Sequence, residues 1–108
     1  SKRKRFIAEY IIKKNYKKVG IYRLTMKKSS YNFRSSAILD IINILTENGT
    51  DLQIYEPYLN EDFFNGIKIE KDIKKFKLNT DFIIANRIHP EIEDVSDKVF
   101  SRDIFNEN

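Results

Sequence analysis

The chain has 108 residues, 41% of them hydrophobic and 13% aromatic, with 20 lysines and arginines, 16 acidic residues, one histidine and no cysteine. This length fits one domain with a modest core, and the apolar content excludes a disordered or low-complexity chain. Without cysteine there are no disulfides and no thiolate ligands or nucleophiles in this chain, a single histidine argues against a zinc site, and no apolar run approaches the roughly 20 residues of a membrane helix.

The first elements in chain order are a helix and a strand. Residues 4–14 place apolar side chains at helical spacing, with charges on the opposite side, which predicts an amphipathic helix ending near Asn15. Residues 17–24 contain a short β-rich run that suits a buried strand. A polar loop over residues 25–34 follows this strand.

The next elements are a second helix and a second strand. Ser35 or Ser36 can cap the helix, residues 38–45 repeat apolar side chains at helical spacing, and Asn48-Gly49 is a typical helix end. Residues 51–57 then predict a strand that is closed by a proline.

The remaining third of the chain repeats this order. A short helix is predicted over residues 70–78, a third strand over residues 81–87, a helical turn over residues 90–95 and a fourth strand over residues 98–100. Strands separated by helices favour parallel pairing with right-handed crossovers. The sequence therefore predicts one α/β domain over residues 1–108, a three-layer α/β/α Rossmann-like fold with a mostly parallel sheet of about four strands.

Ligands of such sheets bind beyond the carboxyl ends of the strands. That rule selects the 25–34 loop, Glu56-Pro57 and residues 86–89. The loop combines Lys27 and Arg34 with serines ahead of a helix N-terminus, a setting that favours a phosphate group, although a solvated basic loop is the competing interpretation. It contains no glycine, so it is neither a Walker A loop nor a dinucleotide fingerprint.

Arg87 follows an apolar strand and is a second candidate ligand residue. The alternative role for Arg87 is a surface ion pair with Glu91 or Glu93. His89 is interpreted as a loop residue, because no nucleophile or acid can be paired with it from the sequence. We predict no catalytic set and no metal site in this chain.

The charge is unevenly spread along the chain. Residues 1–34 hold 12 basic residues and one acidic residue, whereas residues 35–108 hold 8 basic and 15 acidic residues. A one-sided basic segment is typical of proteins that bind a partner carrying phosphates. A small nucleic-acid-binding module is therefore the alternative function. For most of the basic residues between 2 and 18, a solvated helix face is the preferred explanation over nucleic-acid contact.

Several stretches together resemble one known family. They are Phe6-Ile7-Ala8 ahead of Val19-Gly20-Ile21-Tyr22-Arg23-Leu24-Thr25-Met26-Lys27, Ser30-Tyr31-Asn32-Phe33-Arg34-Ser35-Ser36, Ile54-Tyr55-Glu56-Pro57, Ala85-Asn86-Arg87 and Phe100-Ser101-Arg102-Asp103-Ile104-Phe105. In order and spacing they resemble the C-terminal, UDP-binding domain of the UDP-glucose/GDP-mannose dehydrogenase family, in its bacterial UDP-glucose subgroup. The resemblance covers essentially the whole chain.

The resemblance implies a fragment of a cytoplasmic, NAD-dependent oxidoreductase that converts UDP-glucose to UDP-glucuronate. The family's catalytic cysteine and NAD fingerprint do not occur in these residues, so the isolated chain is expected to be inactive, and residues 1–16 are expected to lead in from a central region. The resemblance also implies a homodimeric full-length enzyme, a monomeric fragment, and neither nucleic acid nor membrane as partner.

Four residues of this chain occupy positions that match site residues of the family. The resemblance assigns Lys27, Arg87 and Arg102 to the UDP-sugar substrate and Arg34 to the NAD side. Lys28 and Tyr31 depart from the family pattern, which has serine and aspartate there, and make the loop more cationic. Relatives in this family oxidise other nucleotide sugars, so the exact sugar stays open.

Overall fold

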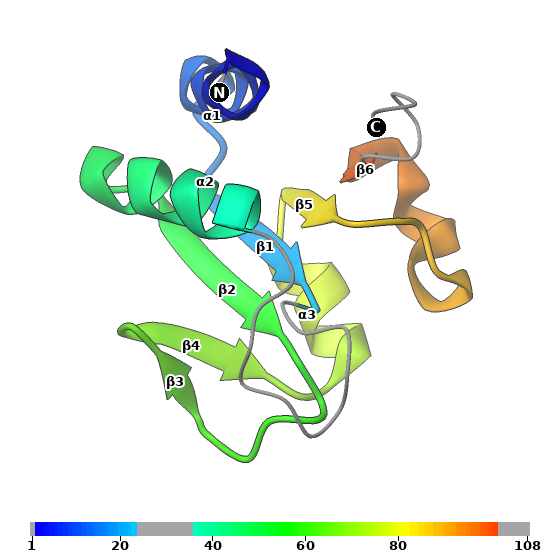
Figure 1. Cartoon of the computed structure of the whole chain (residues 1–108). Coiled ribbons are helices and arrows are strands. Elements are labelled where there is room, and N and C mark those ends of the chain that lie inside the picture. The colour runs from blue at the N-terminus through cyan, green and yellow to red at the C-terminus, as the bar shows by residue number, and fades with distance from the viewer. Residues whose placement is uncertain (1, 24–35, 102–108) are drawn as a thin grey trace.

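A computed structural model of the chain describes residues 2–23 and 36–101 (Figure 1). Its elements in chain order are α1 (Lys2–Lys14), β1 (Lys18–Tyr22), α2 (Ser36–Asn48), β2 (Asp51–Tyr55), β3 (Phe63–Phe64), β4 (Ile67–Glu70), α3 (Ile73–Asn79), β5 (Phe82–Ala85), the 3₁₀ helix η1 (Pro90–Lys98) and β6 (Val99–Ser101). No helix in these described ranges is long and apolar enough to cross a membrane.

The strands form one six-stranded sheet in the order β3-β4-β2-β1-β5-β6. All neighbouring pairs are parallel except β3 with β4. The chain first builds outward from β1 through β2 to β4, and then continues on the other side of β1 with β5 and β6. This reversal beside β1 is the kind of switch point at which open α/β sheets bind ligands.

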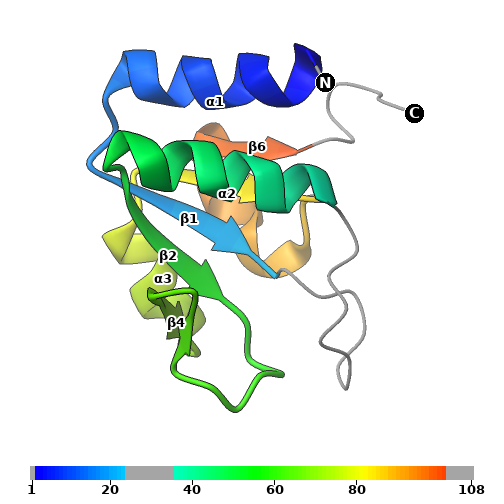
Figure 2. The same ribbon diagram turned by 60° about the vertical axis from the view of Figure 1, so that its left-hand side comes forward.

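Helices cover both faces of the sheet (Figure 2). On one face, buried residues of α1 and α2 pack with the side chains of Val19 and Ile21, and on the other, Phe76 of α3 and Ile92 of η1 pack with Tyr22. Successive strand residues therefore supply two separate cores, as expected for strands that are buried on both sides. The prediction of a three-layer, mostly parallel α/β/α domain is confirmed.

The helix ends follow the local signals in the sequence. Asn15 adopts a left-handed conformation, with a φ of 58°, and its N–H donates to the carbonyl of Ile11 at 3.1 Å, which ends α1 where the prediction placed it. Gly49, with a φ of 86°, follows α2 in the same way. Both residue types adopt this conformation readily, which explains why they stop the two helices.

The prediction missed a hairpin and therefore counted too few strands. Strands β3 and β4 are joined by Asn65 and Gly66, with φ values of 50° and 81°. The prediction of a helix over residues 70–78 was wrong at its start, because Glu70 pairs with Tyr55 in the sheet and the helix begins only at Ile73. An Asn-Gly pair between apolar residues is a strong hairpin signal, so the sequence did contain the information.

Candidate functional site

The carboxyl ends of the parallel strands meet at one edge of the sheet. In the described residues, Arg23 follows β1, Glu56 and Pro57 follow β2, and residues 86–89 follow β5. Two of the three segments selected from the sequence therefore lie at this edge, on the two strands that flank β1. The third segment, residues 25–34, lies outside the described residues.

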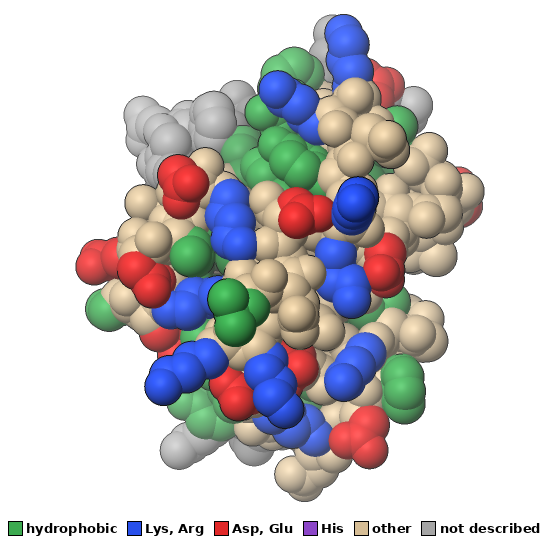
Figure 3. Space-filling view, turned by 180° about the vertical axis from the view of Figure 1, so that it is seen from behind, with side chains coloured by type: hydrophobic (Ala, Val, Ile, Leu, Met, Phe, Trp, Pro, Cys, Tyr) green, Lys and Arg blue, Asp and Glu red, His purple; other side chains and the backbone are tan. Residues whose placement is uncertain are grey.

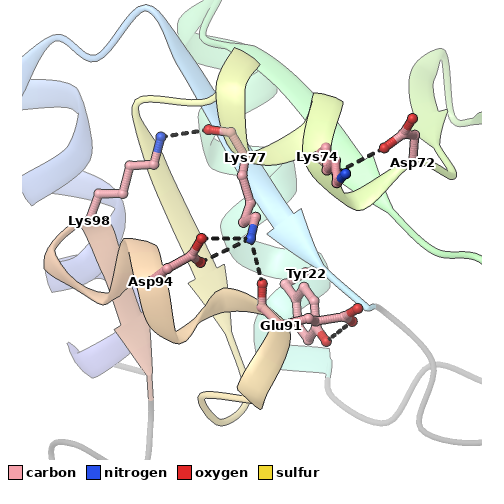
Figure 4. Close-up of polar contacts among 7 residues, drawn as sticks. All are labelled: Tyr22, Asp72, Lys74, Lys77, Glu91, Asp94 and Lys98. Carbon is pink, nitrogen blue, oxygen red and sulfur yellow. Dashed lines mark hydrogen bonds and ion pairs between the residues drawn. The ribbon is translucent and has the colours of Figure 1, made fainter.

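Tyr22, the last residue of β1, connects this strand to the segment that follows β5. Its side chain is 3% exposed, and its hydroxyl donates a hydrogen bond to the carboxylate of Glu91 (Figure 4). Its ring stacks on that of Tyr55 with centroids 5.4 Å apart, and the ring of His89 lies 5.3 Å away. Burial and the hydrogen bond to Glu91 raise the pKa of Tyr22, so the hydroxyl keeps its proton and remains a donor.

Arg23 lies at the same edge in a strained conformation. Its φ is 60°, which is unfavourable for a residue with a side chain, and its N–H donates to the carbonyl of Tyr55 at 2.8 Å. The guanidinium carbon lies 4.8 Å from the ring centroid of Tyr58, within the range of a cation–π interaction. The positive charge also lowers the pKa of the neighbouring Tyr22 hydroxyl, in opposition to the larger effects of burial and Glu91.

Two buried carboxyl groups hold the loops after β2 and β4. Glu56 is completely buried, and its carboxylate accepts the N–H of Tyr58 at 3.3 Å. Glu70 is 9% exposed, and its carboxylate accepts the N–H groups of Lys71 and Asp72 at 3.1 and 3.0 Å. Both carboxylates therefore accept backbone hydrogen bonds, an arrangement that fixes loop geometry. The sequence analysis selected Glu56 only by its place at a strand end.

Arg87 is the one predicted ligand residue that falls within the described ranges. It is exposed and lies two residues beyond Ala85, the end of β5. The other predicted ligand residues, which are Lys27, Arg34 and Arg102, lie outside the described residues, as do Lys28 and Tyr31. Their roles therefore stay predictions.

Charges of both signs mix on the face that carries α3. Figure 3 shows basic side chains (Lys or Arg) among acidic ones (Asp or Glu) there. Lys71 pairs with Asp62 at 3.4 Å, and Lys77 pairs with Asp94 at 2.9 Å. In the described part of the chain, no group of three or more histidine and acidic side chains could hold a metal ion.

The chain was compared with known proteins. The family model described as "UDP-glucose/GDP-mannose dehydrogenase family, UDP binding domain" matches residues 20–107. A UDP-glucose 6-dehydrogenase of Campylobacter jejuni is 46% identical over 105 residues, which cover 95% of this chain and 27% of that protein. A UDP-glucose 6-dehydrogenase of Streptococcus pneumoniae is 41% identical over 103 residues, 95% of this chain and 26% of that protein. The chain thus spans about a quarter of the length of these relatives, and neither they nor the family match support the nucleic-acid alternative.

Proposed function

The chain belongs to the UDP-glucose/GDP-mannose dehydrogenase family, and we propose that it is the lobe that binds the nucleotide sugar in a UDP-glucose 6-dehydrogenase. Such an enzyme oxidises UDP-glucose to UDP-glucuronate with NAD. The two relatives that carry this name support the proposal, since their similarity extends over 95% of the chain. With no cysteine among its residues, this chain contributes binding, and the nucleophile comes from outside it.

One observation carries the proposed binding role. Arg87 is exposed at the carboxyl edge of the sheet, two residues after β5, and β5 pairs directly with β1. The chain that leaves β1 contains Lys27, so we propose that both cations, together with Arg102, pair with the diphosphate and sugar oxygens of the substrate. Binding energy from the remote nucleotide would then place the sugar for oxidation in the rest of the enzyme.

The glycines of this chain do not form a dinucleotide cradle. Gly20 lies inside β1 against Phe76, Gly49 follows α2, and Gly66 lies in the turn between β3 and β4. None of the three follows the carboxyl end of a parallel strand, where a dinucleotide-binding loop needs close backbone approach. NAD would therefore be held mainly outside this chain, and we propose only Arg34 as a contact from this side.

We propose the oligomeric state and the location of the enzyme from its family membership as well. The full-length enzyme would be a cytoplasmic homodimer, and the 108-residue chain a monomer. Sedimentation of the chain in solution tests the second of these statements.

A titration tests the proposed binding role. We expect UDP and UDP-glucose to bind weakly and to shift the amide resonances of Arg87 and of the 25–34 loop. Arg87→Ala should weaken UDP binding but leave uridine binding unchanged, since uridine has no phosphate. Lys74→Ala, on the exposed side of α3, is the matched control. If saturating UDP leaves both segments unshifted, the proposed site is wrong.

A further inference from the structure

The segment that carries Arg87 is attached to β1 by a partly buried side-chain hydrogen bond. Glu91 lies four residues beyond Arg87, in the first turn of η1, and its carboxylate accepts the hydroxyl of Tyr22 (Figure 4). Tyr22 is almost fully buried at the end of β1. The two residues are 69 positions apart in the sequence, so this bond closes a long loop at the candidate site.

The backbone around Glu91 is fixed independently of its carboxylate. The ammonium group of Lys77 on α3 donates to the carbonyl of Glu91 at 2.9 Å and to the carboxylate of Asp94 at 2.9 and 3.0 Å. Ile92 is completely buried, and its N–H donates to the carbonyl of His89 at 3.0 Å. The start of η1 is therefore attached to α3 through Lys77. The bond between Tyr22 and Glu91 attaches the same turn to the end of β1.

Contacts of Tyr22 reach further along the edge of the sheet. Its ring lies 5.3 Å from that of His89, the residue that precedes η1. Arg23, the next residue, places its guanidinium over Tyr58 in the loop after β2. The hydrogen bond of Tyr22 thus joins the segment after β5 to the end of β1, and the contact of Arg23 joins the residue after β1 to the loop after β2.

We propose that Tyr22 and Glu91 are a positioning pair, which holds residues 86–89 against the end of β1 so that Arg87 meets the anionic ligand. This inference rests on the proposed function. Neither residue needs to touch the ligand, because the pair acts through the position of the segment that carries Arg87. A hydrogen bond between a hydroxyl and a carboxylate is directional and strong for its size. When the bond is removed, we expect Arg87 to sample orientations that do not bind.

The hydroxyl of Tyr22 can be removed without changing the packing. Phenylalanine fills the same volume, so Tyr22→Phe deletes the donor and leaves the stacked ring in place. Glutamine at position 91 keeps an acceptor oxygen, whereas alanine does not. Tyr55→Phe is the matched control, because Tyr55 belongs to the same buried cluster but is not the donor to Glu91.

The test measures the affinity of the 108-residue chain for UDP-glucose by calorimetry. The temperature is kept far below the thermal unfolding midpoint of every variant. Tyr22→Phe and Glu91→Ala should each weaken binding about fivefold, the size expected for one hydrogen bond, and the double variant should be no weaker than either single variant. Glu91→Gln should restore binding to within about twofold of the natural chain, and Tyr55→Phe should leave it unchanged. Natural affinity in Tyr22→Phe overturns the positioning role.

A measurement without ligand separates this inference from the proposed function. We expect amide hydrogen exchange at residues 86–89 to accelerate in Tyr22→Phe and to stay unchanged in Tyr55→Phe. If the natural chain does not bind UDP-glucose, the proposed function fails, yet faster exchange would still show that the pair holds this segment. If exchange is the same in Tyr22→Phe and the natural chain, the pair does not hold the segment.

Discussion

The ring of Phe76 occupies the space into which a side chain on Gly20 would project. A Cβ atom on Gly20 would lie 2.5 Å from Cζ of Phe76 and 2.8 Å from Cγ2 of Thr80. Phe76 is completely buried between α3 and the sheet, so its ring has little room to move. The absence of a side chain at this position is what lets α3 pack directly on the central strand.

Gly20→Ala should therefore destabilise the fold by overpacking. We expect the free energy of unfolding to fall by about 1–3 kcal/mol, as measured by urea denaturation. In a Phe76→Leu background, which provides space, the same substitution should cost less. An equal cost in both backgrounds would contradict the contact as its cause.

The side chain of Asp72 caps α3. It accepts the N–H groups of Lys74 and Lys75 at 2.9 and 3.3 Å, which would otherwise have no partner within the helix. Asp72→Ala should lower the free energy of unfolding by about 1 kcal/mol in thermal or urea denaturation. As a control, Asp62→Ala removes an exposed ion pair with Lys71 and should cost less than about 0.5 kcal/mol. Equal losses in the two variants would argue against the cap.

The opposite end of α3 is held by Lys98. Its ammonium group donates to the carbonyl of Lys77 at 2.7 Å and to that of Thr80, at the end where helix carbonyls lack partners (Figure 4). Lys98→Met keeps most of the apolar stem and should destabilise the chain by about 1–2 kcal/mol. Lys75→Met, on the exposed side of α3, should have little effect on the same urea curve.

Acid should weaken the ion pair between Lys77 and Asp94. The hydrogen bond from Lys77 lowers the pKa of Asp94 below its ordinary value of 3.8. A lowered pKa means that the stabilisation is complete above the unfolded value and is lost as the pH falls through the folded value. The difference in unfolding free energy between the natural chain and Asp94→Asn should thus shrink when urea curves recorded at about pH 6 are repeated at about pH 3. A difference that does not change with pH would show that this pair does not titrate as described.

Much of the architecture was accessible from the sequence because its signals are local. Helix α2 follows from apolar side chains at helical spacing ahead of Asn48-Gly49, and β5 follows from a continuous apolar run. The hairpin of β3 and β4 was missed because β3 has only two residues, although Asn65-Gly66 marked its turn. Short strands give too few residues for a period to be recognised.

The candidate site was only partly accessible. Arg87 could be placed at the carboxyl edge because an arginine that closely follows an apolar strand of a parallel sheet lies there. The bond between Tyr22 and Glu91 could not, because nothing local pairs residues 69 positions apart. Sequence analysis thus located a cation at the edge, but not the contacts that hold its segment in place.

Helix α1 belongs to the folded unit, although the match to the family model begins after it. The family match begins at residue 20, yet Ile7, Ala8 and Ile11 of α1 are at most 6% exposed and complete the core on one face of the sheet. Cutting the chain at the start of the match would remove α1 and expose the part of that face which α1 covers, while α2 would remain. The piece that folds as described therefore includes a helix that precedes the family-model match, and the similarity to the two relatives, which covers 95% of the chain, extends into this helix.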